Sequence, residues 1–378
     1  MSDRKGVTLV WPVAANTGGV ELIARETLEH FSGRRPTTFV GTSMTPPVEG
    51  VRHVRVEPKL GNVRRPVAFR RDSQRALQEL DPGDAVISMG ANCAPGGVRW
   101  VHSVHGAFLR VPGRLQVGPM QVSARWRHAL PRHQVLLALE RNYFQRHPPR
   151  MVLATSERER EDLVELYDVD PDAVHVIGNG YNPALFNNQH RVRVRDEVRG
   201  RLGIPDGRLC VLFAANELHR KGFATLLAAL ARLRRDDVRV DVVGKADPAP
   251  LVAAAEARGW VPQVYWHGSS PRIADFYAAG DLLVLPTYYE PFGLVLVEAL
   301  ATGLPVVTTR LAGASPYVTP ECGRLIERPD DDEELATVLD GCLEASVLAR
   351  MSRVAPAAVR ELEWSAVFNR VEDLVLRD

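Results

Sequence analysis

The sequence has few cysteines and no long apolar run, and both absences narrow the class of protein. Only four cysteines occur among 378 residues, and their spacing fits neither a metal site nor a disulfide framework: Cys93, Cys210, Cys322 and Cys342. No segment reaches the roughly 18 apolar residues that a membrane-spanning helix requires. The chain starts with a predicted strand over residues 7–13 and without the apolar stretch of a secretory signal. We therefore expect a cytoplasmic protein with reduced thiols.

Positive and negative charges nearly balance over the whole chain, but they are unevenly distributed between its two parts. The formal net charge is +1. Residues 1–150 contain 22 Lys and Arg against 11 Asp and Glu, whereas residues 151–378 contain 25 against 35. A length of 378 residues is typical of two domains. The sequence therefore predicts two electrostatically distinct domains and no nucleic-acid partner.

The first domain begins with a strand, a glycine turn and a helix. Gly18 and Gly19 lie between the strand at residues 7–13 and an amphipathic helix over residues 20–31. Glycines in this position let an anion approach the backbone N–H groups at the start of the helix, which is a phosphate-binding arrangement. A tight turn that needs glycine accounts for the same residues equally well, so both interpretations stay open.

His105 is the next candidate, followed by an unusually basic stretch. We place His105 and the glycine after it at the end of a strand over residues 100–106, where α/β proteins bind ligands. Residues 107–150 then carry eight arginines and one acid, Glu140, with apolar side chains interspersed. This composition suits an anionic membrane surface or glycolipid. A solvated basic face is the alternative.

Alternation of strands and helices restarts in the second half of the chain. We interpret the polar, arginine-rich residues 187–201 as part of a linker between domains. The predicted fold is α/β, with one domain over residues 1–186 and another over residues 187–363. A final helix, residues 364–378, is expected to pack back on the first domain.

The second domain is organised around residues 289–301, between two apolar strands. Glu290 precedes a helix and Glu298 lies two turns inside it. The N-terminus of that helix offers unpaired backbone N–H groups and a partial positive charge, at Phe292, Gly293 and Leu294. Two carboxylates around a glycine loop suit a polyhydroxylated ligand, because each can accept hydroxyl hydrogen bonds.

Together these stretches resemble glycosyltransferase family 4, whose members are retaining, nucleotide-sugar-dependent enzymes. The resemblance rests on the glycine turn, the strand-end histidine, Arg220-Lys221-Gly222 and the Glu290…Glu298 spacing, and it spans nearly the whole chain. Within the family the chain looks most like bacterial lipopolysaccharide core glucosyltransferases. The implied fold is GT-B, in which two Rossmann-like domains face each other across a cleft. The resemblance implies that residues 1–186 form the acceptor-side domain and residues 187–363 the nucleotide-sugar-binding domain.

The resemblance also implies a reaction and a role for each matched residue. A hexose would pass, with retained configuration, from a nucleotide diphosphate donor to a glycan, glycolipid or small-molecule acceptor. Catalytic contacts would come from Glu290 and His105 on the sugar and from Arg220 and Lys221 on the diphosphate. Donor binding would use Gly18, Gly19, Phe292, Gly293, Leu294 and Glu298. No cofactor and no metal are implied, and a UDP-sugar is favoured over a GDP-sugar.

Two features depart from this pattern. Pro316 stands three residues after Gly313, where many members carry an acid, so no acidic contact is expected there. Asp330, Asp331 and Asp332 look like the metal motif of another glycosyltransferase fold. They precede a predicted helix over residues 333–339, and we interpret them as its acidic N-cap.

Two other functions are compatible with the same architecture. A sugar-nucleotide 2-epimerase would change the sugar nucleotide without an acceptor. A non-catalytic nucleotide-sugar-binding subunit would bind the donor without transferring it.

Overall fold

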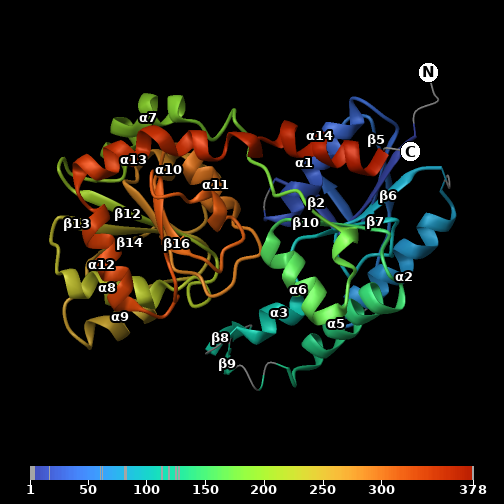
Figure 1. Ribbon diagram of the computed structural model, residues 1–378, viewed down its shortest axis with the longest axis horizontal. Coiled ribbons are helices and arrows are strands. Elements are labelled where there is room, and N and C mark those ends of the chain that lie inside the picture. Colours follow the sequence, from blue (N-terminus) through green and yellow to red (C-terminus); the bar gives the residue numbers. More distant parts are fainter. Residues whose placement is uncertain are drawn as a thin grey trace. The chain divides into compact units, whose positions relative to one another are not determined.

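The protein divides into two compact units, each with its own sheet and core (Figure 1). The computed structural model describes residues 5–16, 18–59, 61, 63–80, 83–111, 114–117, 120–123, 126 and 128–376. Unit 1 comprises Met1–Val111, Ser123–Asn179 and Trp364–Asp378, and unit 2 comprises Pro112–Val122 and Gly180–Glu363. Strands and helices alternate in both units, which confirms the predicted α/β class.

Unit 1 is built on a seven-stranded parallel sheet with the order β11-β10-β7-β6-β1-β3-β5. Its strands are short, and the central ones are mostly buried because both faces of a parallel sheet are covered: β1 (Val7–Val10), β3 (Thr37–Gly41), β5 (Val51–Arg55), β6 (Ala85–Ser88), β7 (Val98–Val101), β10 (Met151–Ala154) and β11 (Val174–Val176). Its helices are α1 (Val20–Ser32), α2 (Arg65–Gln78), α3 (His105–Arg110), α5 (Pro131–Arg141), α6 (Glu157–Tyr167) and α14 (Trp364–Leu376). Short strands also pair as β2 (Val13–Ala15) with β4 (Ser43–Thr45) and β8 (Arg114–Val117) with β9 (Met120–Ser123).

The last helix, α14, packs on unit 1 although it follows unit 2 in the chain. Glu372 accepts hydrogen bonds from Arg35 Nε at 3.0 Å and Nη2 at 2.8 Å. Phe368 is buried and meets Trp100 edge to face, with ring centroids 6.3 Å apart. Arg370 donates to the carbonyl of Ile177 at 3.1 Å. These contacts anchor α14 to strand β7, to the segment after helix α1 and to the segment after β11.

Unit 2 contains a six-stranded parallel sheet with the order β14-β13-β12-β15-β16-β17. Its strands are β12 (Leu209–Ala214), β13 (Val238–Val243), β14 (Gln263–Trp266), β15 (Leu282–Leu285), β16 (Val306–Thr309) and β17 (Gly323–Ile326). Its helices are α7 (Asn188–Arg201), α8 (Phe223–Leu233), α9 (Ala249–Glu256), α10 (Ile273–Ala279), α11 (Leu294–Ala301), α12 (Asp332–Cys342) and α13 (Ala345–Ala358). The central strands β12 and β15 are apolar and buried, so the core lies on both faces of the sheet.

Residues 187–201, which we expected to include part of a linker, instead lie in unit 2, where Asn188–Arg201 form helix α7. The side chain of Asn187 caps the helix by accepting from His190 N at 2.7 Å. Buried Arg191 donates to the carbonyls of Tyr277 at 2.6 Å and Gly280 at 2.9 Å. The arginines that suggested a solvated segment therefore cap the carbonyl end of α10, where cations are favourable. The division between the units falls after Asn179, before this helix rather than inside it.

Gly222 shows how tightly the loop after β12 is packed. Its φ of +77° is a conformation that residues with a Cβ rarely adopt. A Cβ at this position would lie only 2.1 Å from the carbonyl oxygen of Pro286. Only glycine fits this turn, which precedes helix α8.

We expect Gly222→Ala to lower the free energy of unfolding by about 2 kcal/mol or more, because strain and a backbone clash add. Gly341→Ala is the matched control, since Gly341 lies in α12 and a Cβ added there would meet no atom within 4 Å. That change is expected to be neutral or to stabilise by up to about 1 kcal/mol. Urea denaturation followed by circular dichroism measures both, and equal midpoints for the two variants would contradict the packing described for Gly222.

Candidate active site

The predicted residues of unit 2 gather at the carboxyl ends of the adjacent strands β12 and β15. The backbone N–H of Tyr288 donates to the carbonyl of Arg220 at 2.9 Å, which ties the two loops together. The Arg220 guanidinium donates to the carbonyl of Tyr289 and pairs with both oxygens of Glu217, at 3.0 and 3.1 Å. Arg220 is thereby held in one orientation beside the loop that carries Glu290.

Lys221 and Glu290 form an ion pair across these loops. Lys221 is only 8% exposed. Burial and the neighbouring Arg220 guanidinium lower the pKa of the Lys221 amine, and Glu217 opposes them. Glu290 supplies the anionic partner that a buried ammonium needs. The structure thus brings three predicted residues together: Arg220, Lys221 and Glu290.

The loop that carries Glu290 is fixed by backbone hydrogen bonds to the segment after β16. Gly313 N donates to the carbonyl of Glu290 at 2.9 Å, and Ala314 N donates to that of Phe292 at 2.8 Å. Gly293 then adopts a φ of +104° and starts helix α11 at Leu294. Leu296 N donates to the carbonyl of Gly293 at 3.0 Å. The N–H groups before it precede the first bond of the helix and suit an anion or a polar ligand.

Glu298 is buried inside α11, eight residues after Glu290. Its carboxylate accepts a hydrogen bond from the hydroxyl of Tyr277 at 2.9 Å. Burial raises the pKa of Glu298 to about 7, and the hydrogen bond from Tyr277 lowers it. Glu298 therefore changes charge near neutral pH, which makes it the titrating acid of this helix.

The other predicted residues, Gly18, Gly19 and His105, belong to unit 1. Gly19 starts helix α1, its carbonyl accepts from Ile23 N at 3.1 Å, and Gly18 has a φ of +92°. A Cβ at Gly19 would meet no atom within 4 Å, so the backbone there is open to a ligand. The positive φ of Gly18 agrees with the tight-turn interpretation, and the free space at Gly19 is compatible with the phosphate-binding interpretation.

His105 does not end a strand, as the sequence had indicated, but begins helix α3. The buried carboxylate of Glu140 accepts from the backbone N–H of His105 at 2.6 Å and of Gly106 at 3.0 Å, and also from the hydroxyl of Tyr167. A carboxylate at this position satisfies the first N–H groups of a helix and favours its positive end. The lone acid of the basic stretch therefore sets where α3 starts and where His105 lies.

The imidazole of His105 is held by a second residue that the sequence did not reveal. His133 Nδ1 lies 2.9 Å from His105 Nε2, and the rings stack with centroids 4.9 Å apart. Burial and His133 lower the pKa of His105 to about 4. His105 is consequently neutral at physiological pH. The one sequence signal for this arrangement was the isolated Glu140 among arginines, since nothing marked His133.

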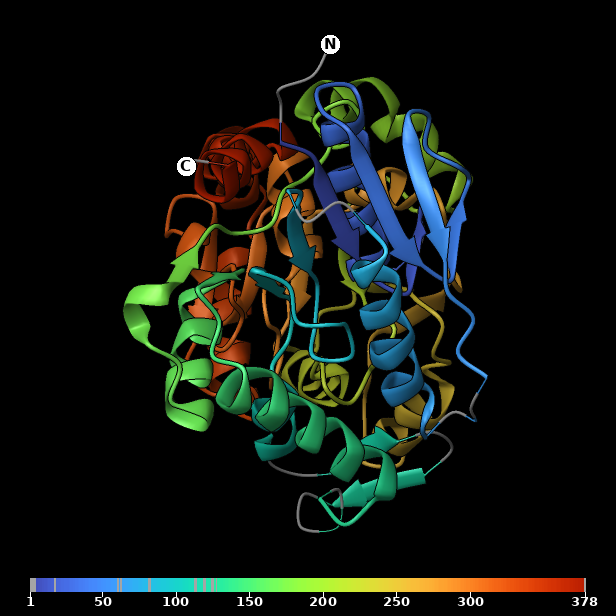
Figure 2. The same ribbon diagram turned by 90° about the vertical axis from the view of Figure 1, so that its right-hand side faces the viewer.

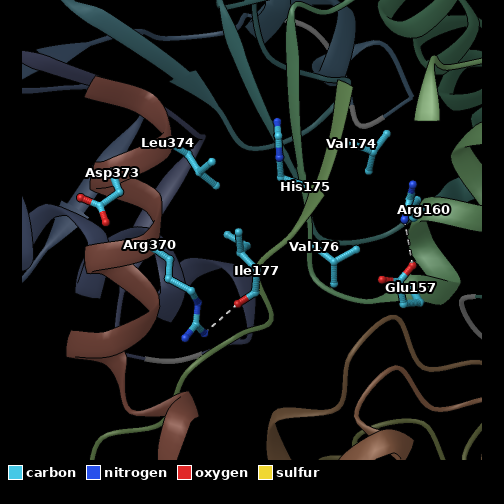
Figure 3. Close-up of a pocket in the computed structure, with 9 residues that line it drawn as sticks. All are labelled: Glu157, Arg160, Val174, His175, Val176, Ile177, Arg370, Asp373 and Leu374. Carbon is cyan, nitrogen blue, oxygen red and sulfur yellow. Dashed lines mark hydrogen bonds and ion pairs between the residues drawn. The ribbon is translucent and has the colours of Figure 1, made fainter. Parts of the chain in front are cut away.

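Two pockets of the described surface lie away from these residues. Figure 3 shows one of about 460 Å³ in unit 1, between strand β11 and helices α6 and α14. Another, of about 580 Å³, lies in unit 2 between the start of α7 and the end of α13. None of the predicted site residues lines either hollow.

The acidic run at residues 330–332 is a helix cap. Asp331 is the N-cap of α12, and its side chain accepts from Glu334 N at 2.9 Å. This matches the interpretation of the run as an N-cap rather than a metal motif. Within the described ranges, no group of three or more His, Cys, Asp or Glu side chains is arranged to hold a metal ion.

We expect Glu140→Ala to lower the free energy of unfolding by about 3 kcal/mol, because it leaves buried donors without their acceptor. Glu165→Ala is the matched control: Glu165 pairs with Arg110, but its side chain is 66% exposed. Its removal is expected to cost under about 1 kcal/mol. Urea denaturation distinguishes the two, and a Glu140 variant as stable as the Glu165 variant would show that Glu140 does not hold α3.

Two family models match the chain in succession. The model described as Glycosyltransferase Family 4 matches residues 17–185. The model described as Glycosyl transferases group 1 matches residues 194–356. Together they cover most of unit 1 and nearly all of unit 2.

Curated relatives show moderate similarity over part of their length. The chain is 28% identical to lipopolysaccharide glucosyltransferase WaaG of Escherichia coli (strain K12) over 232 residues, which is 60% of each chain. It is 33% identical to a D-inositol 3-phosphate glycosyltransferase of Xylanimonas cellulosilytica over 223 residues, which is 56% of this chain and 53% of that protein. The matched region thus spans about half to three fifths of these relatives.

Solved structures match over nearly the whole chain. The crystal structure of WaaG superimposes with a TM-score of 0.82 at 22% identity, covering 98% of this chain and 100% of that one. Anabaena HepE in complex with UDP and glucose gives 0.71 at 19% identity, with coverage of 98% and 99%. These matches confirm the predicted GT-B fold. Because the two family models account for successive halves of this fold, the chain belongs to glycosyltransferase family 4.

Proposed function

We propose that the protein is a retaining, metal-independent glycosyltransferase that moves a hexose from a nucleotide diphosphate to a glycan, glycolipid or small-molecule acceptor. One observation carries this proposal: Arg220 and the Lys221–Glu290 pair lie together at the carboxyl edge of the unit 2 sheet. In open α/β sheets, ligands bind at this edge. The start of α11 follows Glu290 by only four residues, so cations, a carboxylate and helix N–H groups converge there.

The chemistry follows from charge that develops on the donor. The bond between the anomeric carbon and the phosphate oxygen breaks, and its electron pair leaves with the diphosphate. Arg220, Lys221 and the N-terminus of α11 stabilise that negative charge. The acceptor hydroxyl forms the new bond on the same face of the sugar, and its proton passes to the departing phosphate oxygen.

The remaining residues hold the donor in this scheme. Glu290 and the N–H groups of Phe292, Gly293 and Leu294 orient the sugar, and Glu298 binds the ribose hydroxyls. From unit 1, neutral His105 contacts the sugar, while Gly18 and Gly19 offer backbone donors to the diphosphate. Uridine is favoured as the base because HepE, a structural neighbour, was solved with UDP-glucose.

Donor screening tests the proposal directly. We expect transfer from a UDP-hexose, with the product anomer retained as judged by NMR, and no loss of rate with a chelator. Conversion of the sugar nucleotide without an acceptor would instead identify a 2-epimerase. Binding without any turnover across acceptors would favour a non-catalytic subunit.

In the same assay, Arg220→Ala and Lys221→Ala are each expected to lower kcat about 100-fold, the scale seen on removing one electrostatic contact to a transition state. Arg232→Ala is the control, because Arg232 is half-exposed and pairs with Asp332 away from the site. Unchanged turnover of the Arg220 and Lys221 variants at saturating donor, with intact circular dichroism, would remove these residues from the mechanism.

We further propose that unit 1 contacts an anionic membrane or glycolipid through helices α2 and α5, the second of which lies in the basic stretch at residues 107–150. Helices α2 and α5 lie side by side in unit 1 (Figure 2). Their outer surface is rich in exposed cations: Arg64, Arg65, Arg71, Arg75, Arg132 and Arg141. Trp126 is 65% exposed and Val67 43% exposed on the same unit. The side chains of residues 112–125 and residue 127, including Leu115 and Met120, lie outside the described residues.

We propose that the protein works at the cytoplasmic face of a membrane, and this basic surface supports the proposal. The four cysteines are free and buried, as suits a reducing compartment. In the described part of the chain, no helix has the length and apolarity to span a bilayer.

Co-sedimentation with vesicles tests the membrane contact. We expect binding to anionic vesicles at low salt that weakens as salt screens the charges, because each cation near the surface contributes about 1 kcal/mol. A double change of Arg71 and Arg75 to Glu on α2 should weaken binding more than a change of Arg350 and Arg353 to Glu on α13. Absence of binding at low salt would favour a soluble acceptor.

A further inference from the structure

Tyr277 contacts Glu298 from a neighbouring helix of unit 2. Helices α10 and α11 pack against each other (Figure 1), and the Tyr277 hydroxyl donates to Glu298 Oε2 at 2.9 Å. Tyr277 has no exposed surface, and Glu298 is 9% exposed. The Tyr277 hydroxyl therefore hydrogen-bonds to one oxygen of a carboxylate that is almost completely buried.

Tyr277 is itself anchored on its backbone side. Its carbonyl accepts from Arg191 Nη1 at 2.6 Å, and Arg191 Nη2 also donates to the carbonyl of Gly280 at 2.9 Å. The Tyr277 ring packs against Phe186, with centroids 5.8 Å apart. Because both its backbone and its ring are held by neighbours, Tyr277 keeps a fixed position next to the Glu298 carboxylate.

Among the residues that the structure describes around Glu298, no cation pairs with its carboxylate. On α10, Asp275 is paired with Arg201 at 2.7 Å and with Arg272 at 2.6 Å. The α13 arginines, Arg350 and Arg353, are exposed to solvent. Strand β16 contributes valine and threonine side chains. Burial and the Tyr277 hydroxyl are the influences that set the pKa of Glu298, the first raising it and the second lowering it.

We propose that Tyr277 is a positioning residue for donor binding, whose hydroxyl fixes one oxygen of Glu298 and keeps the carboxylate ionised to accept ribose hydroxyls. This inference rests on the proposed function, in which Glu298 binds the ribose. Tyr277 touches neither the donor nor the reacting atoms in this scheme and acts through Glu298.

The role has a pH signature. A carboxylate accepts hydroxyl hydrogen bonds, whereas its protonated form loses acceptor capacity. Donor affinity is therefore present above the pKa of Glu298, at about 7, and is lost as the pH falls through it. Removing the phenol hydroxyl raises this pKa further, so the loss of affinity moves to higher pH.

Titration calorimetry with UDP-glucose, repeated across pH values from about 5.5 to 8.5, measures this signature. We expect the affinity midpoint of Tyr277→Phe to lie about one pH unit above that of the wild type, the scale of one hydrogen bond to a charged group. Tyr265→Phe is the control, because its hydroxyl contacts Gln263 on the edge strand β14 and should leave the midpoint unchanged. Identical midpoints for wild type and Tyr277→Phe would overturn the proposal, as would a wild-type affinity that does not vary with pH.

A second measurement separates this inference from the proposed function. NMR of ¹³C-carboxyl-labelled glutamate follows the titration of Glu298 without any ligand, with the signal assigned by its loss in Glu298→Gln. If the wild type binds no UDP-glucose at any pH, the proposed donor is wrong, but the NMR midpoint still tests Tyr277. An upward shift in Tyr277→Phe supports the positioning role, and an unchanged midpoint overturns it.

Discussion

Backbone hydrogen bonds between loops at the carboxyl edge of the unit 2 sheet are the constraint on which the site depends. Tyr288 N reaches the carbonyl of Arg220, and Gly313 N reaches that of Glu290, so the loops after β12, β15 and β16 form one braced layer. Side chains on separate loops would otherwise lose their geometry through backbone freedom. Because these hydrogen bonds join main-chain atoms, they do not depend on the identity of the side chains. The exception is a position such as Gly222, where the chain turns too tightly for a Cβ and glycine is required.

Buried charge is compensated by a specific partner in both units. Lys221 forms an ion pair with Glu290. Arg239 donates two hydrogen bonds to the carboxylate of Asp241, at 2.6 and 2.7 Å, and both residues are only 1% exposed. Glu140 uses backbone N–H groups and a tyrosine hydroxyl instead of a cation. Desolvation makes an unpartnered charge costly, so each pair also fixes the position of its neighbours.

Desolvation also sets the protonation states that the proposed chemistry uses. It lowers the pKa of His105 to about 4 and raises that of Glu298 to about 7. One residue is therefore a neutral hydrogen-bonding group at physiological pH, and the other titrates there. Burial shifts acids and bases in opposite directions because it always disfavours the charged form.

Local patterns in the sequence determined the fold class and the alternation of strands and helices, since short apolar strands and helix periodicity are properties of adjacent residues. The grouping of Arg220 and Lys221 with Glu290 was expected from the family resemblance and not from a local pattern. Only the tertiary structure decided how the polar segments behave. The arginines of residues 187–201 look solvated in sequence, but Arg191 and Arg195 cap α10 from 86 and 83 residues away. His105 starts a helix because Glu140, 35 residues away, supplies its cap. His133 and Tyr277 acquire their partners in the same way, through contacts between elements distant in sequence, and no local pattern records such contacts.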